Sequence, residues 1–198
     1  MNIQSLDSQI LLLINHGFTN AWLDIIMPAL SQQGYLLVIP FLLAMLAQSM
    51  KRTDQAGKTY FAAAVWTLVI ACLAAYLAEW AEDALKVAIA RERPCRAIEG
   101  IRLIIPCPKS YSMPSGHAMS SFSFAAPLFF LTRAYIIPLG RLYPLVLASL
   151  IAFSRIYLGV HYPTDVLVGT ILGGIIGLAL SMAYQVIGTE ETGKRITR

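Results

Sequence analysis

The feature that most constrains the fold is a set of long segments without charged side chains. Residues 25–50, 59–78 and 166–189 contain no Asp, Glu, Lys or Arg, and residues 110–132 form a fourth such segment that begins polar. A helix needs about 20 mainly apolar residues to cross a bilayer. Only 13% of the 198 residues are charged, against about 25% in a typical soluble domain. The sequence therefore predicts a polytopic membrane protein.

Five membrane spans are predicted, at residues 34–48 (or from about 24), 60–78, 117–132, 142–160 and 165–187. The fourth is long enough only if Arg155 points into the protein. Residues 1–15 contain no Lys or Arg, so no cleaved signal peptide is expected. Their apolar run ends at His16 and Gly17, which predicts a short interfacial helix, with a first transmembrane segment as the alternative. The expected fold class is all-α, one polytopic membrane helix bundle over residues 1–198, with five to six transmembrane helices and an N-terminal interfacial helix.

The positive charges divide between the two faces that these spans define. One face holds eight of the fifteen Lys and Arg residues, and the other holds seven. Three of the seven are candidates for the site. When these three are set aside, the comparison is eight positive charges against four. The positive-inside rule then places the eight in the cytoplasm and the polar connection 91–114 outside, so the expected location is the inner (plasma) membrane with the site facing outward. The basic residues form no aromatic-interleaved patch, so the net charge of +4 does not indicate nucleic-acid binding. The eight are Lys51, Arg52, Lys58, Arg133, Arg141, Lys194, Arg195 and Arg198.

The stretch 154–165 places a histidine and an aspartate at the start of the last span. Pro163 fits the first turn of a helix, where its missing N–H does no harm. His161 then lies just before this helix and Asp165 within its first turn. The carboxylate can reach back to one imidazole nitrogen and leave the other free to attack a substrate.

Two further clusters are expected at the same face. One contains Lys86 and Arg93-Pro94, and the other is the run 114–117 with Ser115, Gly116 and His117. Taken singly, each has an ordinary explanation. Lys86 and Arg93 could anchor the helix at the membrane interface, and Ser115-Gly116 could cap the next helix. His117 could be an interfacial histidine whose hydrogen bonds are satisfied. Glu82, four residues before Lys86, predicts an ordinary surface salt bridge. Together with Arg155, however, the clusters supply the cations, helix N-terminus, histidines and carboxylate that phosphoryl transfer requires.

These residues resemble the tripartite signature of the type-2 phosphatidic acid phosphatase family. Lys86 and Arg93-Pro94, then Pro114-Ser115-Gly116-His117, then Ser154-Arg155 with His161 and Asp165 match its three motifs without substitution. The resemblance covers residues 86–165. It implies a lipid phosphatase in which His161 is the nucleophile that forms a phosphohistidine, Asp165 orients it, and His117 protonates the leaving oxygen and then activates water. It also implies a phosphate-binding set, namely Lys86, Arg93, Ser115, Gly116 and Arg155.

The substrate and partners are less constrained than the chemistry. The connection 95–113 is too short for a large hydrophilic cap, which suits a lipid head group with a long tail. Undecaprenyl diphosphate is preferred, and phosphatidylglycerophosphate, phosphatidate and the lipid A 1-phosphate are the alternatives. No cofactor is expected, and no metal either, because no acidic cluster is left to hold one. A lipid transporter and a catalytically inactive homologue are the competing hypotheses.

Two residue spacings give structural expectations. Cys95 and Cys107 both lie in the outward connection, where an oxidising compartment would permit a disulfide; two free thiols are the alternative. Gly169, Gly173 and Gly177 are spaced by four, which permits close helix packing. Packing within one chain is the favoured interpretation, and a homodimer remains open.

Overall fold

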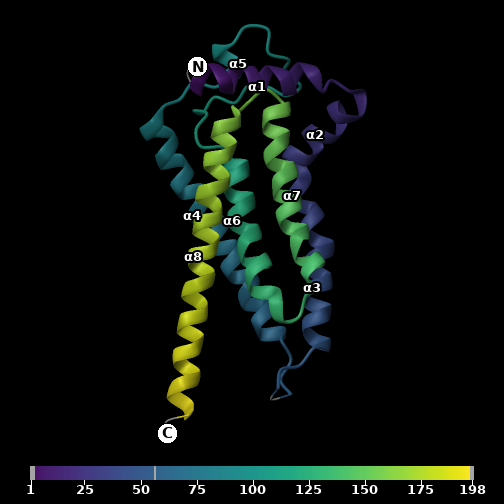
Figure 1. Ribbon diagram of the computed structural model, residues 1–198, viewed down its shortest axis with the longest axis vertical. Coiled ribbons are helices and arrows are strands. Elements are labelled where there is room, and N and C mark those ends of the chain that lie inside the picture. Colours follow the sequence, from purple (N-terminus) through teal and green to yellow (C-terminus); the bar gives the residue numbers. More distant parts are fainter. Residues whose placement is uncertain (1–2, 56, 197–198) are drawn as a thin grey trace.

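The described part of the chain is a bundle of helices that run along one axis (Figure 1). The computed structural model describes residues 3–55 and 57–196, and within these ranges it contains no β-strand. This confirms the predicted all-α class. In chain order the elements are α1 (Ile3–Gly17), α2 (Ala21–Gln33), the 3-10 helix η1 (Gly34–Val38), α3 (Ile39–Lys51), α4 (Phe61–Ile89), α5 (Pro94–Ala97), α6 (Gly116–Leu131), the 3-10 helix η2 (Thr132–Ala134), α7 (Pro138–Tyr157) and α8 (Pro163–Ile196).

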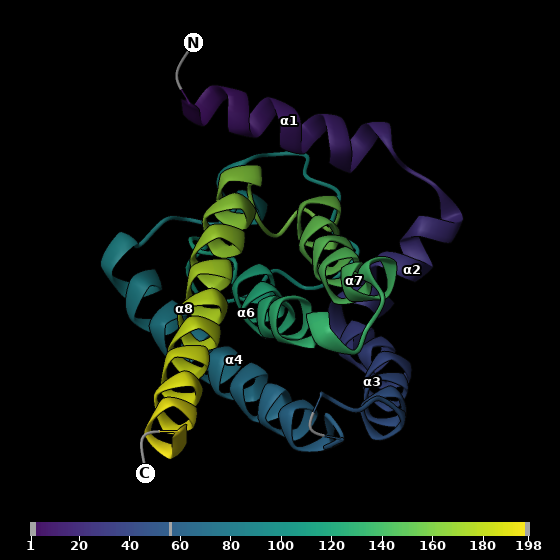
Figure 2. The ribbon, with the colours of Figure 1, turned by 60° about the horizontal axis from the view of Figure 1, so that its bottom comes forward.

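Four helical segments are long and apolar enough to cross a membrane. They are Ala21–Lys51, Phe61–Ala97, Pro138–Tyr157 and Pro163–Ile187 within the described residues. Helices α2, η1 and α3 together form the first of these, so this span begins at the deeper of the two predicted starts. The third predicted span corresponds to α6, which has only 16 residues. Figure 2 shows α6 in the middle of the bundle, with α4, α7 and α8 around it. Because other helices cover it, α6 needs less length than a helix that faces lipid.

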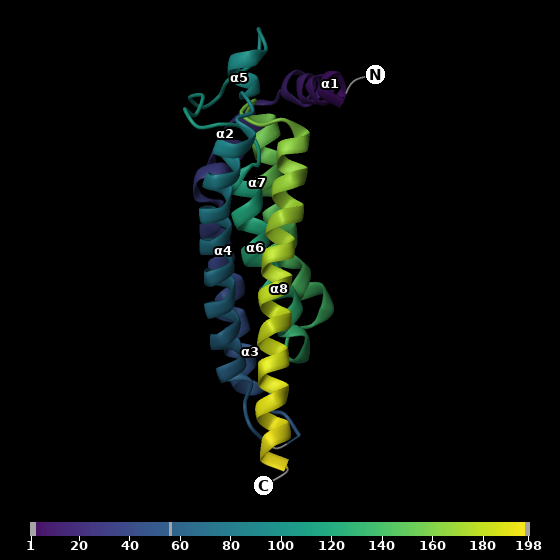
Figure 3. The same ribbon diagram turned by 90° about the vertical axis from the view of Figure 1, so that its left-hand side faces the viewer.

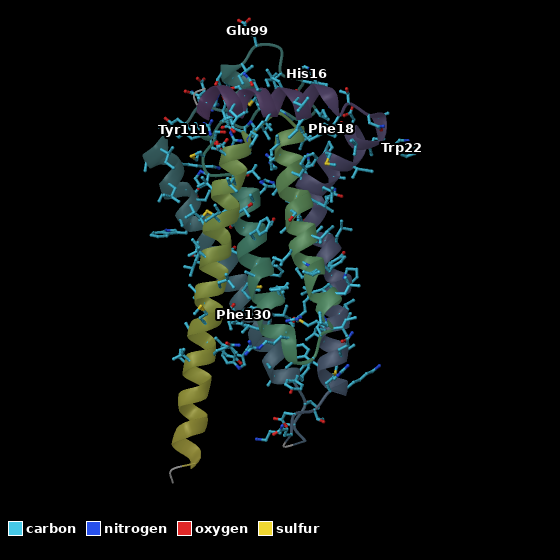
Figure 4. All side chains as sticks on the ribbon, in the orientation of Figure 1. His16, Phe18, Trp22, Glu99, Tyr111 and Phe130 are labelled. Carbon is cyan, nitrogen blue, oxygen red and sulfur yellow. A yellow bond between two sulfur atoms is a disulfide. The ribbon has the colours of Figure 1, made fainter. Side chains whose placement is uncertain are left out.

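Helix α1 lies across one end of the bundle instead of along it (Figures 1 and 3). Asp7, Leu11 and Asn15 are buried, with 2%, 0% and 0% of their surface exposed. Their spacing of four places them on one helix face, which packs against the bundle. The neighbouring Phe18 and Trp22 are 54% and 74% exposed (Figure 4), as aromatic side chains at a membrane interface are. This arrangement agrees with an interfacial helix and not with a first transmembrane segment.

A buried apolar cluster joins α1 to the ends of α6, α7 and α8. Leu11 is its fully buried contribution from α1, and burying one leucine side chain stabilises by roughly 1.5–3 kcal/mol. The cluster therefore fixes the helix ends that carry the motif residues. Its members are Leu11, Ala118, Ala152, Ile156, Tyr162 and Val166.

A disulfide closes a loop within the connection between α4 and α6. Cys95 and Cys107 form a disulfide with their Cα atoms 6.0 Å apart, which confirms the predicted pairing. Cys72 is a free and exposed cysteine in α4.

Gly159 adopts a φ of 73° just after α7, and a Cβ there would overlap Ile101 of the connection between α4 and α6. Glycine therefore lets the chain turn toward His161 while the connection packs closely over it.

The glycine ladder of α8 packs against the backbone of α6. A Cβ atom added at Gly169 would lie 2.6 Å from the carbonyl oxygen of Ser115. A Cβ at Gly173 would overlap the carbonyl group of Met119, and one at Gly177 would lie 2.5 Å from the carbonyl oxygen of Ser123. The spacing of four therefore serves packing within the chain, as favoured from the sequence.

We predict that Gly173→Ala destabilises the protein, because the added methyl group must displace the α6 backbone. Overpacking of this kind costs typically about 1–3 kcal/mol. Gly174→Ala is the matched control, since a Cβ at Gly174 would meet nothing within 4 Å. Thermal unfolding of both variants in detergent micelles measures the difference, and equal midpoints would contradict the packing argument.

Candidate active site

The three sequence motifs meet at the end of the bundle that carries α1. Because neighbouring helices run in opposite directions, the ends of α4 and α7 lie beside the starts of α6 and α8 (Figure 1). They enclose a pocket of about 650 Å³, within the usual range for small-molecule sites. The motif residues that line it are Lys86, Arg93, Gly116, His117, Arg155 and His161.

His161 is held in a defined protonation state. The side chain is 2% exposed, and its Nε2 lies 2.9 Å from Nη1 of Arg93. A guanidinium can only donate, so Nε2 must accept and the proton of the neutral ring resides on Nδ1. Burial lowers the pKa of His161 to about 3, and the charges of Arg93 and Arg155 add to this shift while Asp165 opposes it. The imidazole therefore stays neutral at physiological pH, with the Nε2 lone pair turned toward the pocket cations.

Asp165 lies behind His161, on the side away from Nε2. Its Oδ2 is 3.5 Å from Nδ1 of His161, at the outer limit of a hydrogen bond, and Nδ1 has no closer partner among the described residues. The same oxygen accepts hydrogen bonds from the Ser112 hydroxyl at 2.5 Å and the Tyr162 N–H at 2.8 Å. These two donors therefore hold the completely buried carboxylate behind the imidazole ring.

Two arginines bring positive charge to the pocket. Arg93 donates from Nη1 to the carbonyl of Val160 at 2.9 Å and from Nε to the carbonyl of Ser110 at 2.8 Å. Arg155 is 5% exposed and donates from Nη1 to the Ser31 hydroxyl, while its buried Nε has no partner within the described chain. Charged donors left over in a buried pocket suit an anionic ligand. Arg155 also points into the protein, as the length of its span required.

The start of α6 contributes helix-end groups and a histidine. His117 is exposed toward the pocket, and Gly116 lines the same wall. The hydroxyl of Ser115 is buried and has no partner in the described structure. The backbone N–H of Ser115, however, donates to the carbonyl of Asp165 at 3.0 Å. This N–H ties α6 to α8 and is therefore not free for an anion. Gly116 remains at the helix start, where an anion is favoured.

Glu82 has a different environment from the one predicted. It forms the expected ion pair with Lys86, but their side chains are only 12% and 11% exposed. Both line the pocket, and the Glu82 carboxylate lies where a Cβ of Gly116 would be. The interpretation as an ordinary surface salt bridge is wrong. The spacing of four predicts the pair but not its depth, because depth depends on the helices packed around α4.

An apolar cavity of about 490 Å³ continues from the pocket into the bundle. The two cavities share four residues, namely Tyr35, Ser120, Ser121 and Ile151. The remaining lining of the second cavity is apolar and comes from η1, α3, α4, α6 and α7: Leu36, Val38, Ile39, Ala75, Phe124, Ala125, Pro144, Leu147 and Ala148. A charged compartment therefore opens directly into an apolar one.

Sequence reasoning missed two residues beside the site, Ser112 and Arg91. Ser112 reaches the carboxylate of Asp165 from the connection before α6, and Arg91 reaches its other oxygen at 2.6 Å. Arg91 lies inside the first motif, between Lys86 and Arg93, and this position is the signal that could have found it. Among the described residues, no three His, Cys, Asp or Glu side chains gather as a metal site would require.

Comparison with known proteins agrees with this geometry. Residues 63–188 match the PAP2 superfamily. The chain is 31% identical over 143 residues to a Sulfolobus acidocaldarius protein named undecaprenyl-diphosphatase, an alignment that covers 72% of this chain and 59% of that protein. It is 37% identical over 109 residues to the decaprenylphosphoryl-5-phosphoribose phosphatase of Mycobacterium tuberculosis, covering 55% of this chain and 56% of the relative. The chain thus spans less than two thirds of the length of these relatives.

Two solved structures share the fold. A transmembrane PAP2-type phosphatidylglycerolphosphate phosphatase from Bacillus subtilis superimposes with a TM-score of 0.67 at 24% identity, covering 93% of this chain and 87% of that one. LpxE of Aquifex aeolicus gives a TM-score of 0.64 at 24% identity, with coverages of 91% and 98%. The helix bundle, the three motifs and the family match together show that the chain belongs to the PAP2 superfamily, and it is a multi-pass membrane protein.

Proposed function

We propose that the protein is a membrane lipid phosphatase that works through a phosphohistidine. The observation that carries this proposal is the placement of His161, with Nε2 beside Arg93 in a cationic pocket and Asp165 behind the ring. A substrate phosphoryl group would displace Arg93 from Nε2, and that nitrogen would attack phosphorus. As the bond from phosphorus to the leaving oxygen breaks, His117 would donate a proton to that oxygen.

The second step returns the enzyme to its starting state. His117, now neutral, would remove a proton from a water molecule, whose oxygen attacks the phosphorus of the phosphohistidine. The bond from phosphorus to Nε2 breaks and inorganic phosphate leaves. Lys86, Arg93 and Arg155 would stabilise the charge on the phosphoryl oxygens in both steps, together with the hydroxyl of Ser115 and the helix start at Gly116. These residues supply the positive charge that the transition state needs, and we propose that the reaction proceeds without a divalent metal.

We predict that His161→Ala abolishes phosphate release and that acid-labile phosphate can be trapped on the wild-type protein. Asp165→Asn should lower the rate by orders of magnitude. The His161 ring becomes positively charged when it bonds to phosphorus, and the substitution removes the negative charge that compensates it. The assay uses purified protein in detergent with a panel of lipid phosphates. Ser149→Ala is the control, because Ser149 lines neither cavity. A His161→Ala variant with a near-normal rate would contradict the mechanism, and transport without phosphate release would favour the transporter hypothesis.

We further propose a polyprenyl diphosphate, undecaprenyl diphosphate, as the substrate. Two features support it: the apolar cavity that leads from the cationic pocket, and the names of the two curated relatives, which both refer to polyprenyl compounds. Phosphatidylglycerophosphate, phosphatidate and lipid A 1-phosphate are the alternatives in the same panel. A higher kcat/KM for any of these than for the diphosphate would contradict this assignment and leave the mechanism intact.

The apolar cavity gives a test of lipid recognition. We predict that Ala75→Phe, which fills part of this cavity, lowers kcat/KM for long-chain substrates and leaves hydrolysis of a short, water-soluble phosphate ester unchanged. Ala62→Phe is the matched control, because Ala62 lies on the same helix and is exposed. Equal losses on both kinds of substrate would show that the cavity does not hold the lipid tail.

We also propose that the site faces outward from the plasma (inner) membrane, as the charge asymmetry indicates. Lys51, Arg52 and Lys58 lie in and after the last turn of α3, at the end away from α1 (Figure 1). Arg133 lies in η2 and Arg141 in the first turn of α7, at the same end. Of the remaining basic residues counted on that side, Arg198 and the side chains of Lys194 and Arg195 lie outside the described residues.

We predict that a membrane-impermeant amine reagent labels Lys109 in intact cells but not Lys51. Both side chains are exposed, so neither is protected by the fold. Lys51 is the last residue of α3, and Lys109 lies in the connection between α5 and α6. Figure 1 shows these two segments at opposite ends of the bundle. Mass spectrometry of the labelled protein gives the readout, with permeabilised cells as the control in which both lysines react. The reverse pattern would place the active site in the cytoplasm.

A further inference from the structure

Arg91 belongs to a buried ion-pair network next to the proposed nucleophile. Its Nη1 donates to Oδ1 of Asp165 at 2.6 Å and to the hydroxyl of Thr164 at 2.7 Å. Its Nη2 donates to Oδ2 of Asp7 at 2.6 Å. The guanidinium also lies 4.0 Å from the ring centre of Tyr162. Arg91 therefore bridges two carboxylates, and it does not line the catalytic pocket.

Asp7 connects this network to the helix that lies across the bundle. It is 2% exposed and belongs to α1, 84 residues before Arg91. Its Oδ1 accepts the backbone N–H of Thr164 at 2.9 Å, and its Oδ2 accepts the Thr164 hydroxyl. A carboxylate at this place caps the first turn of α8 and interacts favourably with the helix dipole. Asp7 thus holds both Arg91 and the start of the helix that carries Asp165.

The network determines how Asp165 faces His161. Arg91 occupies Oδ1 of Asp165, whereas Ser112 and the Tyr162 N–H occupy Oδ2, the oxygen nearest Nδ1. Donors on both oxygens prevent the carboxylate from rotating. Arg91 also supplies the opposite charge that a fully buried carboxylate needs to remain ionised. Without Arg91, the carboxylate would lose the donor on Oδ1 and its compensating charge.

The backbone before Arg91 is unusual in a way that serves this contact. Ala90 ends α4 with a φ of 50°, in the left-handed region that residues other than glycine seldom adopt. Strained residues of this kind persist where the surroundings hold them and gather near functional sites. The turn at Ala90 ends the helix and leads the chain from the Lys86 turn of α4 to the side of α8.

We propose that Arg91 and Asp7 are positioning residues for phosphoryl transfer. Arg91 holds the Asp165 carboxylate against His161, and Asp7 on the surface helix α1 holds Arg91. The inference rests on the function proposed above, because it assigns these residues a part in the same reaction. Neither residue contacts the phosphate pocket, so their contribution lies in turnover and not in substrate binding.

The test compares Asp7→Asn, Arg91→Gln and Arg91→Lys with the wild type on the preferred lipid substrate. Asp7→Asn and Arg91→Gln should lower kcat about 10–100-fold, as loss of an outer partner of a catalytic group commonly does, with KM little changed. Rapid quenching should show that formation of the phosphoenzyme is the slowed step. Arg91→Lys should recover part of the loss, because it keeps the charge beside Asp165.

Two controls separate positioning from general stabilisation. Asp24→Asn removes a carboxylate that pairs with Arg102 at 2.7 Å at the same end of the bundle. Asn15→Ala removes another anchor of α1, whose side chain donates to the carbonyl groups of Arg102 at 2.9 Å and Tyr157 at 2.8 Å. Both controls should keep kcat close to the wild-type value, even where the thermal midpoint falls.

The outcomes distinguish this inference from the proposed function. If the wild type released no phosphate from any lipid, or if His161→Ala remained active, the proposed function would fail and the inference with it. If the wild type is active and His161→Ala is not, but Asp7→Asn and Arg91→Gln retain kcat, only the inference is overturned. A loss of kcat in Asn15→Ala equal to that in Asp7→Asn would likewise overturn it, since attachment of α1 would then be the cause. Should Arg91→Gln not fold, the isosteric Asp7→Asn decides.

Discussion

The close approach of α8 to α6 is the contact on which the site depends. Glycines on α8 bring its backbone against the carbonyl groups of α6, and at the top of this contact the Ser115 N–H donates to the Asp165 carbonyl at 3.0 Å. This bond joins the first turns of the two helices. It thereby fixes the distance between the candidate acid, His117, and the candidate nucleophile, His161, although 44 residues separate them in the chain. Larger residues in the ladder would separate the helices, and the two candidate catalytic groups with them.

The charged pocket shows how an apolar bundle accommodates cations at its end. Buried arginines are costly unless their donors find partners. Arg93 meets this need with backbone carbonyl groups and the Ser110 side chain, whereas Lys86 uses Glu82. The Glu82 carboxylate also lies against Gly116, at the helix start where an anion is favoured. In the proposed reaction, an incoming phosphate would have to compete with this carboxylate for Lys86.

Much of the fold and the site follows from sequence because its signals are local or repeated. The uncharged segments predict the membrane spans, and the alternating direction of these spans predicts that the three motifs converge. The position of Cys95 and Cys107 in one short connection predicts their disulfide. What could not be predicted depends on contacts between distant segments. Asp7 meets Arg91 across 84 residues, and no periodicity marks either as a partner. Glu82 and Lys86 are four residues apart in the sequence whether their ion pair lies on a surface or in a pocket. Its burial therefore shows only once the helices are packed together.

The short length of α6 has a consequence for how a lipid head group reaches the site. A helix of 16 residues is about 24 Å long, which is less than the roughly 30 Å of a hydrocarbon core. Surrounding helices cover α6, so it causes no mismatch with the lipid around the protein. Its first turn can lie below the level of the head groups and still face a polar pocket. For the proposed lipid substrate, water and phosphate would then meet inside the outline of the bilayer, while the lipid tail would stay at its ordinary depth.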